Sequence, residues 1–408
     1  MNLLFAWRYF RAKKSTNAIN IIAWVSMSAI VVGAASLILV LSVFNGFEDL
    51  VKSLYTSFYP DIKVTPASGK TLTLSPGQLD RLRGVNGVRA ISLFVEAQAV
   101  LMNGDNPPYS PYLKGVDSNY TKVSGVAGKV DRGSFSLGTA DQPLAVLGSG
   151  VDYALAIEPE KALQPLDVYL FRRGGPDYTV DPLSSYSHSS LATAGEFKIQ
   201  ADFDDHYVIT NLDFVKQMMG LRPDEYGGVE MAVTDPAQVA AVQQNIRLLL
   251  GANFKVQTRY EQNQNLYNVM RTEKWVIYIV LSLVLVVAAF NMVGALTMLV
   301  WDKQKDIHVL KALGAGNKLI QKIFLSEGIL LALMGGITGI LLAALICALQ
   351  LKYKLIPLEG GSFLIDYYPV KMVASDFLLV CSTILIVALL ASWIPAKKAA
   401  ATPIELKS

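Results

Sequence analysis

Charged residues, cysteine and histidine are all scarce in this sequence. Charged side chains occupy 17% of the 408 positions and hydrophobic ones 52%, whereas about a quarter of a typical soluble domain is charged. The two cysteines, Cys347 and Cys381, lie inside apolar runs and indicate neither a disulfide framework nor a cysteine-based metal site. The formal net charge of +3 gives no support for nucleic-acid binding, which requires a clustered basic face. The composition therefore favours a membrane protein.

The sequence also lacks the common signatures of catalytic and nucleotide-binding sites. No G-x-x-x-x-G-K-[ST] phosphate loop occurs, and residues 314–318 are too short to form one. The turn at 148–150 lacks the spacing of a dinucleotide-binding loop, so we interpret it as a strand-to-helix turn. His188 and His206 lie near acidic residues without the spacing of a metal motif. We therefore expect no enzyme, no metal site and no cofactor bound by this chain.

Long apolar runs, by contrast, are abundant. A helix needs about 20 apolar residues to cross the roughly 30 Å hydrocarbon core. Four segments reach that length, and we predict membrane spans at 21–43, 275–300, 324–349 and 373–394. The first run is longer than the about 7 to 15 apolar residues of a signal peptide and has no clear cleavage site, so we expect it to be retained.

Lysine and arginine gather in three segments outside these runs, and positively charged flanks tend to stay cytoplasmic. The three segments are an interfacial helix at 1–20, a loop at 301–323 and a tail at 395–408. Residues 45–274 instead hold 26 acidic and 21 basic residues, so we expect them on the far side. The prediction is a chain with cytoplasmic N and C termini and a short outer loop at 350–372.

Small and polar residues inside two of the spans predict helix contacts. Gly335 and Gly339, beside Gly336, form a small-xxx-small step that lets another helix approach closely. Asn291 lies deep in the second run, where a polar residue either hydrogen-bonds between helices or lines a cavity. We favour helix packing in both cases.

The segment 44–274 is long enough for one large domain or two small ones. Both of its ends alternate short β-like and helical runs, which predicts an α/β core at about 45–115 and 222–274 with a β-rich insertion at about 116–221. The expected strands are 62–65, 88–102, 111–115, 228–233 and 254–258, and the expected helices are 75–83 and 235–250. The stretch 174–195 has no clear periodicity and is typical of a long exposed loop. The predicted fold class is membrane α-helical, with four transmembrane helices and a large α/β periplasmic domain inserted between helices 1 and 2.

Four local features together resemble one family. They are Leu41-Ser42-Val43-Phe44-Asn45-Gly46-Phe47-Glu48, Asp306-Ile307-His308-Val309-Leu310-Lys311-Ala312-Leu313-Gly314-Ala315, Ser326-Glu327-Gly328, and the final segment from Trp393 to Glu405. In combination they resemble the permease subunits of MacB-like ABC systems, in the MacB-like/FtsX-like permease superfamily. The Asn45-Gly46-Phe47-Glu48 element is similar to the lipoprotein-releasing (Lol) permeases among them, and the resemblance covers the whole chain.

The resemblance implies a subunit that is driven by partners. ATP and Mg would be bound by a separate cytoplasmic ABC ATPase dimer, and a second permease subunit, identical or paralogous, would complete the membrane part. The loop after the second span would be a coupling helix seated in the ATPase, and its residues would be Asp306, Ile307, Leu310, Lys311, Ala312, Leu313 and Gly314. Within it we expect Ile307, Leu310, Ala312 and Leu313 to form an apolar contact face and Gly314 to end the helix.

The implied cargo is a lipoprotein held in the outer leaflet of the inner membrane and then handed to a periplasmic carrier. Its extraction requires coupling to ATP, because each buried CH₂ contributes about 0.8 kcal/mol. The candidate acyl contacts are Val43, Phe44, Phe47, Tyr267, Met270 and Val276. Membrane lipid is a further expected partner of the chain. A carrier-binding loop is expected at 181–191, with Pro182 and Tyr186 as its candidate residues.

Two other functions of the same architecture stay open. An FtsX-like mechanotransmitting permease would regulate a periplasmic hydrolase without moving cargo, and its loss would disturb cell division. A MacB-like efflux permease would carry a fused N-terminal ATPase, which this sequence does not contain. The Asn45-Gly46-Phe47-Glu48 element favours lipoprotein release.

Overall fold

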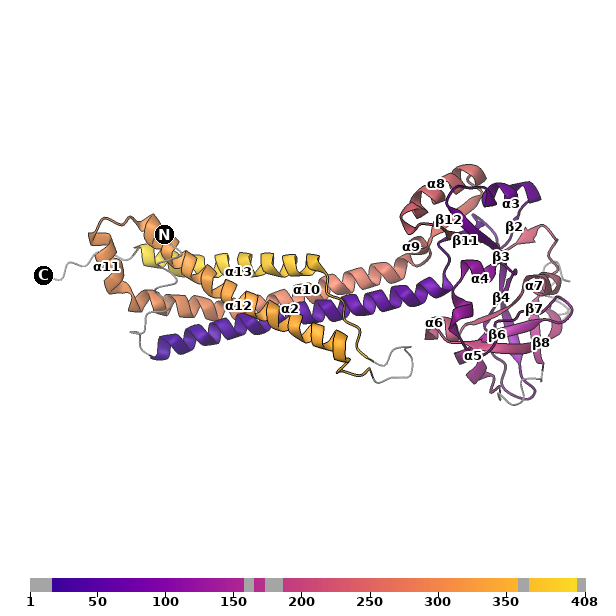
Figure 1. Cartoon of the computed structure of the whole chain (residues 1–408), viewed down its shortest axis with the longest axis horizontal. Coiled ribbons are helices and arrows are strands. Elements are labelled where there is room, and N and C mark those ends of the chain that lie inside the picture. Colours follow the sequence, from indigo (N-terminus) through magenta and orange to yellow (C-terminus); the bar gives the residue numbers. More distant parts are fainter. Residues whose placement is uncertain (1–16, 158–164, 173–185, 359–366, 402–408) are drawn as a thin grey trace, which may run out of the picture. The chain divides into compact units, whose positions relative to one another are not determined.

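The computed structural model describes residues 17–157, 165–172, 186–358 and 367–401 (Figure 1). These residues form two compact units. The membrane unit contains the described residues up to Leu50, from Asn268 to Leu358 and from Tyr367 onward. The domain unit contains the described residues from Val51 to Tyr267.

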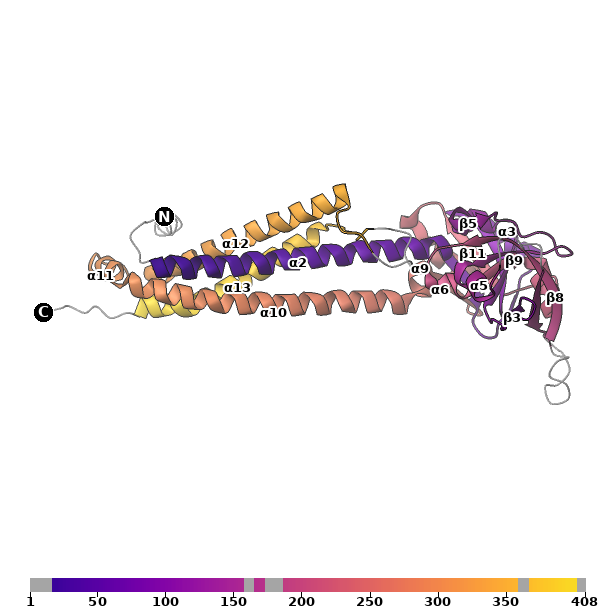
Figure 2. The same ribbon diagram turned by 90° about the horizontal axis from the view of Figure 1, so that it is seen from below.

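Four long helices build the membrane unit, and each is long and apolar enough to cross a membrane. They are α2 (Asn17–Phe58), α10 (Gln264–Asp302), α12 (Asn317–Tyr353) and α13 (Ala374–Ala401). In both views they run along one another as a bundle (Figures 1 and 2). The predicted four spans, with a large α/β domain between the first and second, are therefore confirmed.

Two of these helices extend well beyond their apolar runs. Helix α2 continues past the predicted span end at residue 43 and stops only at Phe58, two residues before Pro60. A proline restricts the residue before it to extended conformations, so the helix ends where that restriction begins. Helix α10 begins at Gln264, well before the apolar run. Both helices therefore have one end in the membrane unit and the other in the domain unit.

Glycines of α12 allow close helix packing, as predicted. A Cβ atom on Gly339 would lie 2.4 Å from the Val31 carbonyl oxygen of α2, and one on Gly335 would lie 3.0 Å from the Met27 carbonyl oxygen. Only glycine permits this approach of two backbones. The packing prediction for Asn291 is not met within this chain, because its side chain is exposed on α10 among the described residues.

The domain unit is built on one sheet, which in the described residues has ten strands in the order β12-β1-β11-β3-β4-β9-β6-β8-β5, with β7 paired to β3 and β8. Strands from the two ends of the domain segment are β1 (Ile62–Pro66), β3 (Val88–Met102), β4 (Tyr112–Val116), β11 (Gly228–Val233) and β12 (Phe254–Thr258). Helices α3 (Pro76–Arg83) and α8 (Val239–Leu250) accompany them, and β2 (Leu72–Thr73) pairs with β10 (Glu225–Tyr226). The strands predicted here are confirmed to within a residue or two.

The segment predicted as an insertion continues the same sheet. Its strands are β5 (Val130–Gly133), β6 (Leu144–Gly148), β7 (Leu166–Phe171), β8 (Tyr186–Phe197) and β9 (Tyr207–Asn211), and its helices are α4 (Tyr120–Val123), α5 (Ser149–Ala154), α6 (Ala201–Asp204) and α7 (Leu212–Met219). Strand β9 pairs in parallel with β4, and β3 is long enough to pair with β11, β4 and β7. One continuous sheet therefore contains strands from both sides of residue 116, where we expected the insertion to begin.

Two local predictions for this segment have different outcomes. Residues 148–150 form a strand-to-helix turn, as predicted, because β6 ends at Gly148 and α5 begins at Ser149. The expectation of a long loop at 174–195 is wrong from Tyr186 onward, where β8 pairs with β7 over six registered positions. The polar Ser and His residues of this segment gave no local signal for a strand. Its pairing with β7 decides the conformation, because cross-strand pairing overrides local β propensity. Residues 173–185 lie outside the described residues.

Candidate functional site

A short helix, α11 (Gln304–Ala312), connects α10 to α12 and contains the residues predicted to couple to a partner. It ends just before Gly314, whose φ is +92° and whose backbone N–H donates to the Lys311 carbonyl at 3.0 Å. The next N–H, of Ala315, donates to the Leu310 carbonyl at 2.9 Å. A glycine is required at this left-handed position, so the helix ends where the sequence predicts.

One side of α11 is fixed to the membrane unit. Ile307 is 1% exposed and packs in a cluster with Ile320 and Phe324 of α12 and Ala396 of α13. The Lys311 ammonium donates to the Ala400 carbonyl at 2.9 Å. Ile307 therefore holds α11 in place and is not available to a partner, in contrast to the expectation from the sequence.

The opposite side of α11 is open. Val309 and Leu313 are 59% and 80% exposed, and Asp306 and Ala312 are exposed beside them. Residues four apart lie on one helix face, so Val309 and Leu313 form an apolar surface next to an acidic side chain. The sequence analysis did not include Val309. The apolar residues of α11 form two rows along the helix, and the helical period alone does not show which row packs against the rest of the chain.

A polar clamp joins three helices at the end of the bundle where α13 begins. The Asn45 amide of α2 donates to the Asp376 carboxylate of α13 at 2.6 Å. The Lys274 ammonium of α10 donates to Asn45 Oδ1 at 2.8 Å and lies 3.3 Å from the Asp376 carboxylate. Asn45 is buried and its amide supplies both a donor and an acceptor, so it forms hydrogen bonds with both charged side chains.

Gly46, the residue after Asn45, allows the backbone segment before α13 to approach α2 closely. A Cβ atom on Gly46 would lie 2.3 Å from the Pro369 carbonyl oxygen and 2.6 Å from the Val370 nitrogen. The Lys371 N–H donates to the Ser42 carbonyl at 2.9 Å, and the Lys371 ammonium forms an ion pair with Asp49. The Asn45-Gly46 pair therefore has a packing role that its local sequence does not reveal.

The six candidate acyl contacts divide between the two units. Val43, Phe44 and Phe47 on α2 are half-buried, and the Phe47 ring meets Tyr368 edge-on at 5.8 Å. On α10, Met270 is half-buried and Val276 is exposed. Val276 also lines an apolar groove along α10 together with Asn268, Val269, Thr272, Glu273 and Ile277. Tyr267 belongs to the domain unit, where its ring stacks on Tyr260 at 4.9 Å.

Of the two predicted carrier-loop residues, one is described. Tyr186 is the first residue of β8, is 40% exposed and meets the Phe171 ring edge-on at 6.0 Å. Pro182 lies outside the described residues.

The end of α2 is anchored in an aromatic cluster of the domain unit. Phe58 is 2% exposed and its ring stacks on Phe203 at 4.3 Å. The Lys114 ammonium lies 5.0 Å from the Phe58 ring and 2.7 Å from the Glu230 carboxylate, with both charges buried. Paired charges and stacked rings at one point give a specific attachment for the helix end.

The segments by which the chain enters and leaves the domain unit are bonded to each other. The Arg259 guanidinium lies 2.8 Å from the Asp61 carboxylate and also donates to the Tyr59 carbonyl at 3.1 Å. The Gln262 amide donates to the Pro60 carbonyl at 3.4 Å. These bonds hold the end of α2 and the short helix α9 (Arg259–Gln262), which precedes α10, in one fixed arrangement.

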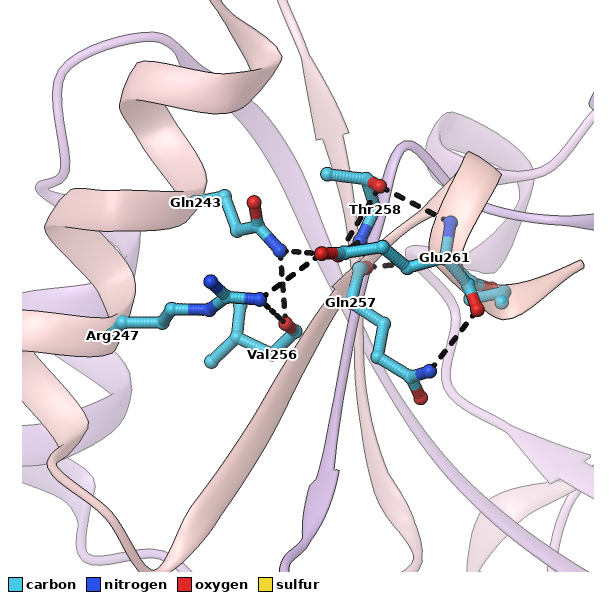
Figure 3. Close-up of polar contacts among 7 residues, drawn as sticks. Gln243, Arg247, Val256, Gln257, Thr258 and Glu261 are labelled. Carbon is cyan, nitrogen blue, oxygen red and sulfur yellow. Dashed lines mark hydrogen bonds and ion pairs between the residues drawn. The ribbon is translucent and has the colours of Figure 1, made fainter. Parts of the chain in front are cut away.

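A second network fixes α9 from the other side (Figure 3). Gln243 and Arg247 of α8 each donate to the Val256 carbonyl on β12 at 3.0 Å, and Arg247 also reaches the Glu261 carboxylate at 3.2 Å. Glu261 and Thr258 form a capping box at the start of α9. Side chains of α8 thus cover part of the open edge of the sheet at β12, and the cap sets the direction in which the chain leaves the domain unit.

Two family models match this chain. The MacB-like periplasmic core domain matches residues 23–249, which is more than half of the chain. The FtsX-like permease C-terminal model matches residues 278–404.

Curated relatives match along nearly the whole length. The lipoprotein-releasing system transmembrane protein LolE of Haemophilus influenzae is 28% identical over 97% of this chain and 96% of that protein. The corresponding LolC proteins are 24% identical in Xylella fastidiosa, over 98% and 96%, and 25% identical in Neisseria meningitidis, over 98% and 97%. Among solved structures, the periplasmic region of MacB from Actinobacillus actinomycetemcomitans is similar at 12% identity and a TM-score of 0.35, covering 54% of this chain and 98% of that one.

Four membrane helices, the domain between the first two of them, and these matches over nearly the full length agree on one classification. The chain belongs to the MacB-like and FtsX-like permease family, and within that family it is a permease of the Lol type.

Proposed function

We propose that this chain is the permease subunit of an ABC transporter that extracts lipoproteins from the outer leaflet of the bacterial inner membrane. The observation that carries the proposal is the match to LolE and LolC across nearly the whole of both chains. A match of that extent includes the membrane helices, the helix α11 and the domain unit together. The chain itself performs no chemistry in this proposal.

The proposed orientation places both termini and α11 in the cytoplasm and the domain unit in the periplasm. Support comes from the lysines between α10 and α12 and after α13, since positively charged segments stay on the cytoplasmic side. The net acidic segment 45–274 is consistent with translocation.

The open face of α11 is the proposed contact with a cytoplasmic ABC ATPase dimer, which would bind ATP and Mg. Val309 and Leu313 would enter an apolar pocket of the ATPase, and Asp306 would lie at the polar rim. Because Ile307 and Lys311 fix the other side of α11, movement of this helix would be passed directly to α12 and α13.

A second permease subunit, identical or paralogous, would face this one and enclose the acyl chains. Val43, Phe44, Phe47, Met270 and Val276 are the proposed acyl contacts within the membrane unit, and Tyr267 is the candidate in the domain unit. The carrier-binding loop around Pro182 and Tyr186 would deliver the lipoprotein to a soluble periplasmic carrier.

Release from a bilayer tests the proposal. The permease and its ATPase would be reconstituted into vesicles with a triacylated lipoprotein, and a soluble acceptor protein with an apolar cleft would be added. We expect ATP to move the lipoprotein into the soluble fraction, and a non-hydrolysable ATP analogue to leave it in the vesicles. If the complex hydrolyses ATP but the lipoprotein stays in the membrane, the lipoprotein-releasing function is wrong and an efflux or mechanotransmitting role takes its place.

A further inference from the structure

The end of α12 that leads towards α13 exposes apolar and basic side chains together. Residues 351–356, which we call the α12 tip, form the end of α12 and the three positions after it, with the sequence Leu-Lys-Tyr-Lys-Leu-Ile. All of its side chains are exposed. The apolar ones, Leu351, Tyr353, Leu355 and Ile356, are 47–64% exposed. Adjacent exposed apolar side chains of this size mark a surface that meets a partner or a membrane.

One buried side chain holds the backbone of the α12 tip. Gln350 is 4% exposed, and its amide nitrogen donates to the Ile356 and Tyr368 carbonyls, both at 3.2 Å. Its amide oxygen accepts from the Ile356 N–H at 3.0 Å, and its backbone carbonyl accepts from the Lys354 N–H at 2.9 Å. Backbone that leaves a helix at membrane depth is tolerated only where its polar groups have partners. The α12 tip meets this condition at the groups that Gln350 binds.

Both lysines of the tip lie against aromatic rings. The Lys354 ammonium is 4.0 Å from the centroid of the Tyr367 ring, and the Lys352 ammonium is 5.2 Å from that of Tyr353. Such a contact places an ammonium over a ring face and leaves its N–H donors available to an anion. Tyrosine and lysine side chains are also typical of the layer between the hydrocarbon core and water.

The length of α12 places the tip at the level of the lipid headgroups. Lys322 and Lys352 lie 30 residues apart in this one helix, which corresponds to a rise of about 45 Å. At the roughly 20° tilt that is usual for membrane helices, the same length spans about 42 Å along the bilayer normal. A bilayer with both headgroup layers is about 40–45 Å thick. When Lys322 lies in one headgroup layer, Lys352 therefore lies in the other.

We propose that the α12 tip inserts into the outer leaflet and that Lys352 and Lys354 bind the headgroup of an anionic phospholipid. Charge complementarity selects this occupant, because two ammonium groups stand among apolar side chains and a phospholipid offers a phosphate next to its acyl chains. The site goes beyond the proposed function, which assigns no role to this end of α12. The choice of leaflet follows the proposed orientation, whereas the binding of the headgroup does not depend on it.

Photo-crosslinking with the full permease and its ATPase in phosphatidylcholine nanodiscs tests the inference. The probe is a phosphatidylglycerol that carries a diazirine next to its headgroup, and mass spectrometry of peptides locates the attached lipid. We expect attachment to residues 351–356. Lys352→Gln with Lys354→Gln should lower the yield there about tenfold or more, because each lysine near an anionic lipid strengthens binding about fivefold. Lys352→Arg with Lys354→Arg keeps both charges and should retain the yield.

A matched control removes the same charge from the domain unit. Lys70 and Lys122 are both exposed there, and Lys70→Gln with Lys122→Gln should leave the yield at the tip unchanged. An equal loss in both double variants would show a response to net charge alone and would overturn the proposal. A phosphatidylcholine that carries the same diazirine provides the lipid control. Its attachment to the tip should be at least about fivefold lower, and equal attachment of the two lipids would also overturn the proposal.

Two further measurements decide between a lipid and other occupants. Glycerol phosphate added at constant ionic strength should leave the attachment unchanged, and its loss would show that the lysines bind a soluble phosphate instead of a lipid. If the probe attaches elsewhere on the chain and not to the tip, protein covers the tip and the proposal is wrong. Lipoprotein release on the same preparation tests the proposed function separately, since a tip that binds the lipid without any release would leave the lipid site standing.

Discussion

At the scale of single residues, Asn45 shows how one side chain can join parts of the sequence that are far apart. Its amide group bonds to Asp376 and to Lys274, which lie on two other helices. Lys274 and Asp376 have 30% and 11% of their side chains exposed, so the pair is only partly screened by water. The Asn45 amide lies between the two opposite charges of this partly buried ion pair. The three groups together fix the spacing and the orientation of the helices that carry them.

Charge reversal across this clamp is the first prediction. Lys274→Asp alone and Asp376→Lys alone each place two like charges side by side, and we expect each to lower the stability of the purified permease by about 3 kcal/mol. The double reversal restores an opposite pair around Asn45 and should recover at least half of that loss. Thermal unfolding in detergent measures all four proteins, and a double variant no more stable than the single variants would show that the clamp does not stabilise the bundle.

At the scale of elements, α11 has two faces with different tasks. Ile307 lies in the cluster formed with α12 and α13, whereas Val309 and Leu313 are exposed. Gly314 separates α11 from α12 by a left-handed turn, so the exposed face keeps a fixed direction relative to the packed face. The same short helix is thus both packed against its own chain and open to a partner.

Substitution of the exposed face is the second prediction. Val309→Asp with Leu313→Asp should abolish binding of the ATPase, or weaken it at least about a hundredfold, because two charged groups would be buried in an apolar contact. Thermal stability should change little, since both side chains are exposed. Co-purification of the ATPase measures the first effect and thermal unfolding the second.

A matched surface control sharpens this test. Leu319→Asp changes a side chain that is 41% exposed on the first turn of α12, outside α11. It should leave ATPase binding intact. Unaltered co-purification of the Val309 and Leu313 double variant would rule out the open face as the coupling surface.

At the scale of the whole molecule, two unbroken helices connect the units. Helix α2 runs from the membrane unit into the aromatic cluster around Phe58, and α10 begins within the domain unit after the capped turn at Thr258. Continuous helices transmit displacement better than flexible linkers do, because each backbone hydrogen bond resists bending. The ion pair between Arg259 and Asp61 joins the segment that follows α2 to the segment that precedes α10.

Interruption of α2 is the third prediction. A Gly-Gly-Ser insertion between Leu50 and Val51 replaces stiff helix by flexible chain, and we expect release of lipoprotein to fall about tenfold or more while ATP hydrolysis continues. The same insertion after Gly104, in a turn with open space around it, should leave release unchanged. Release and hydrolysis measured on the same vesicles decide the outcome, and undiminished release in the α2 variant would contradict a mechanical role for the continuous helix.

The sequence by itself determined the features that depend on local length and periodicity. Apolar runs of membrane length identified the four spans, and alternating patterns placed strands such as β1 and β12. Gly314 marked a helix end because only glycine readily takes that backbone conformation. These properties are encoded within a few neighbouring residues, so they can be read before any tertiary contact is known.

Only the tertiary structure decided which surfaces meet. It turned Ile307 inward and Val309 outward, and it brought Asn45 to Asp376. It also gave the polar residues after Tyr186 a place in the sheet through their pairing with β7. Such contacts depend on the free energy gained when distant segments pack together, and the local sequence of either segment does not contain that information.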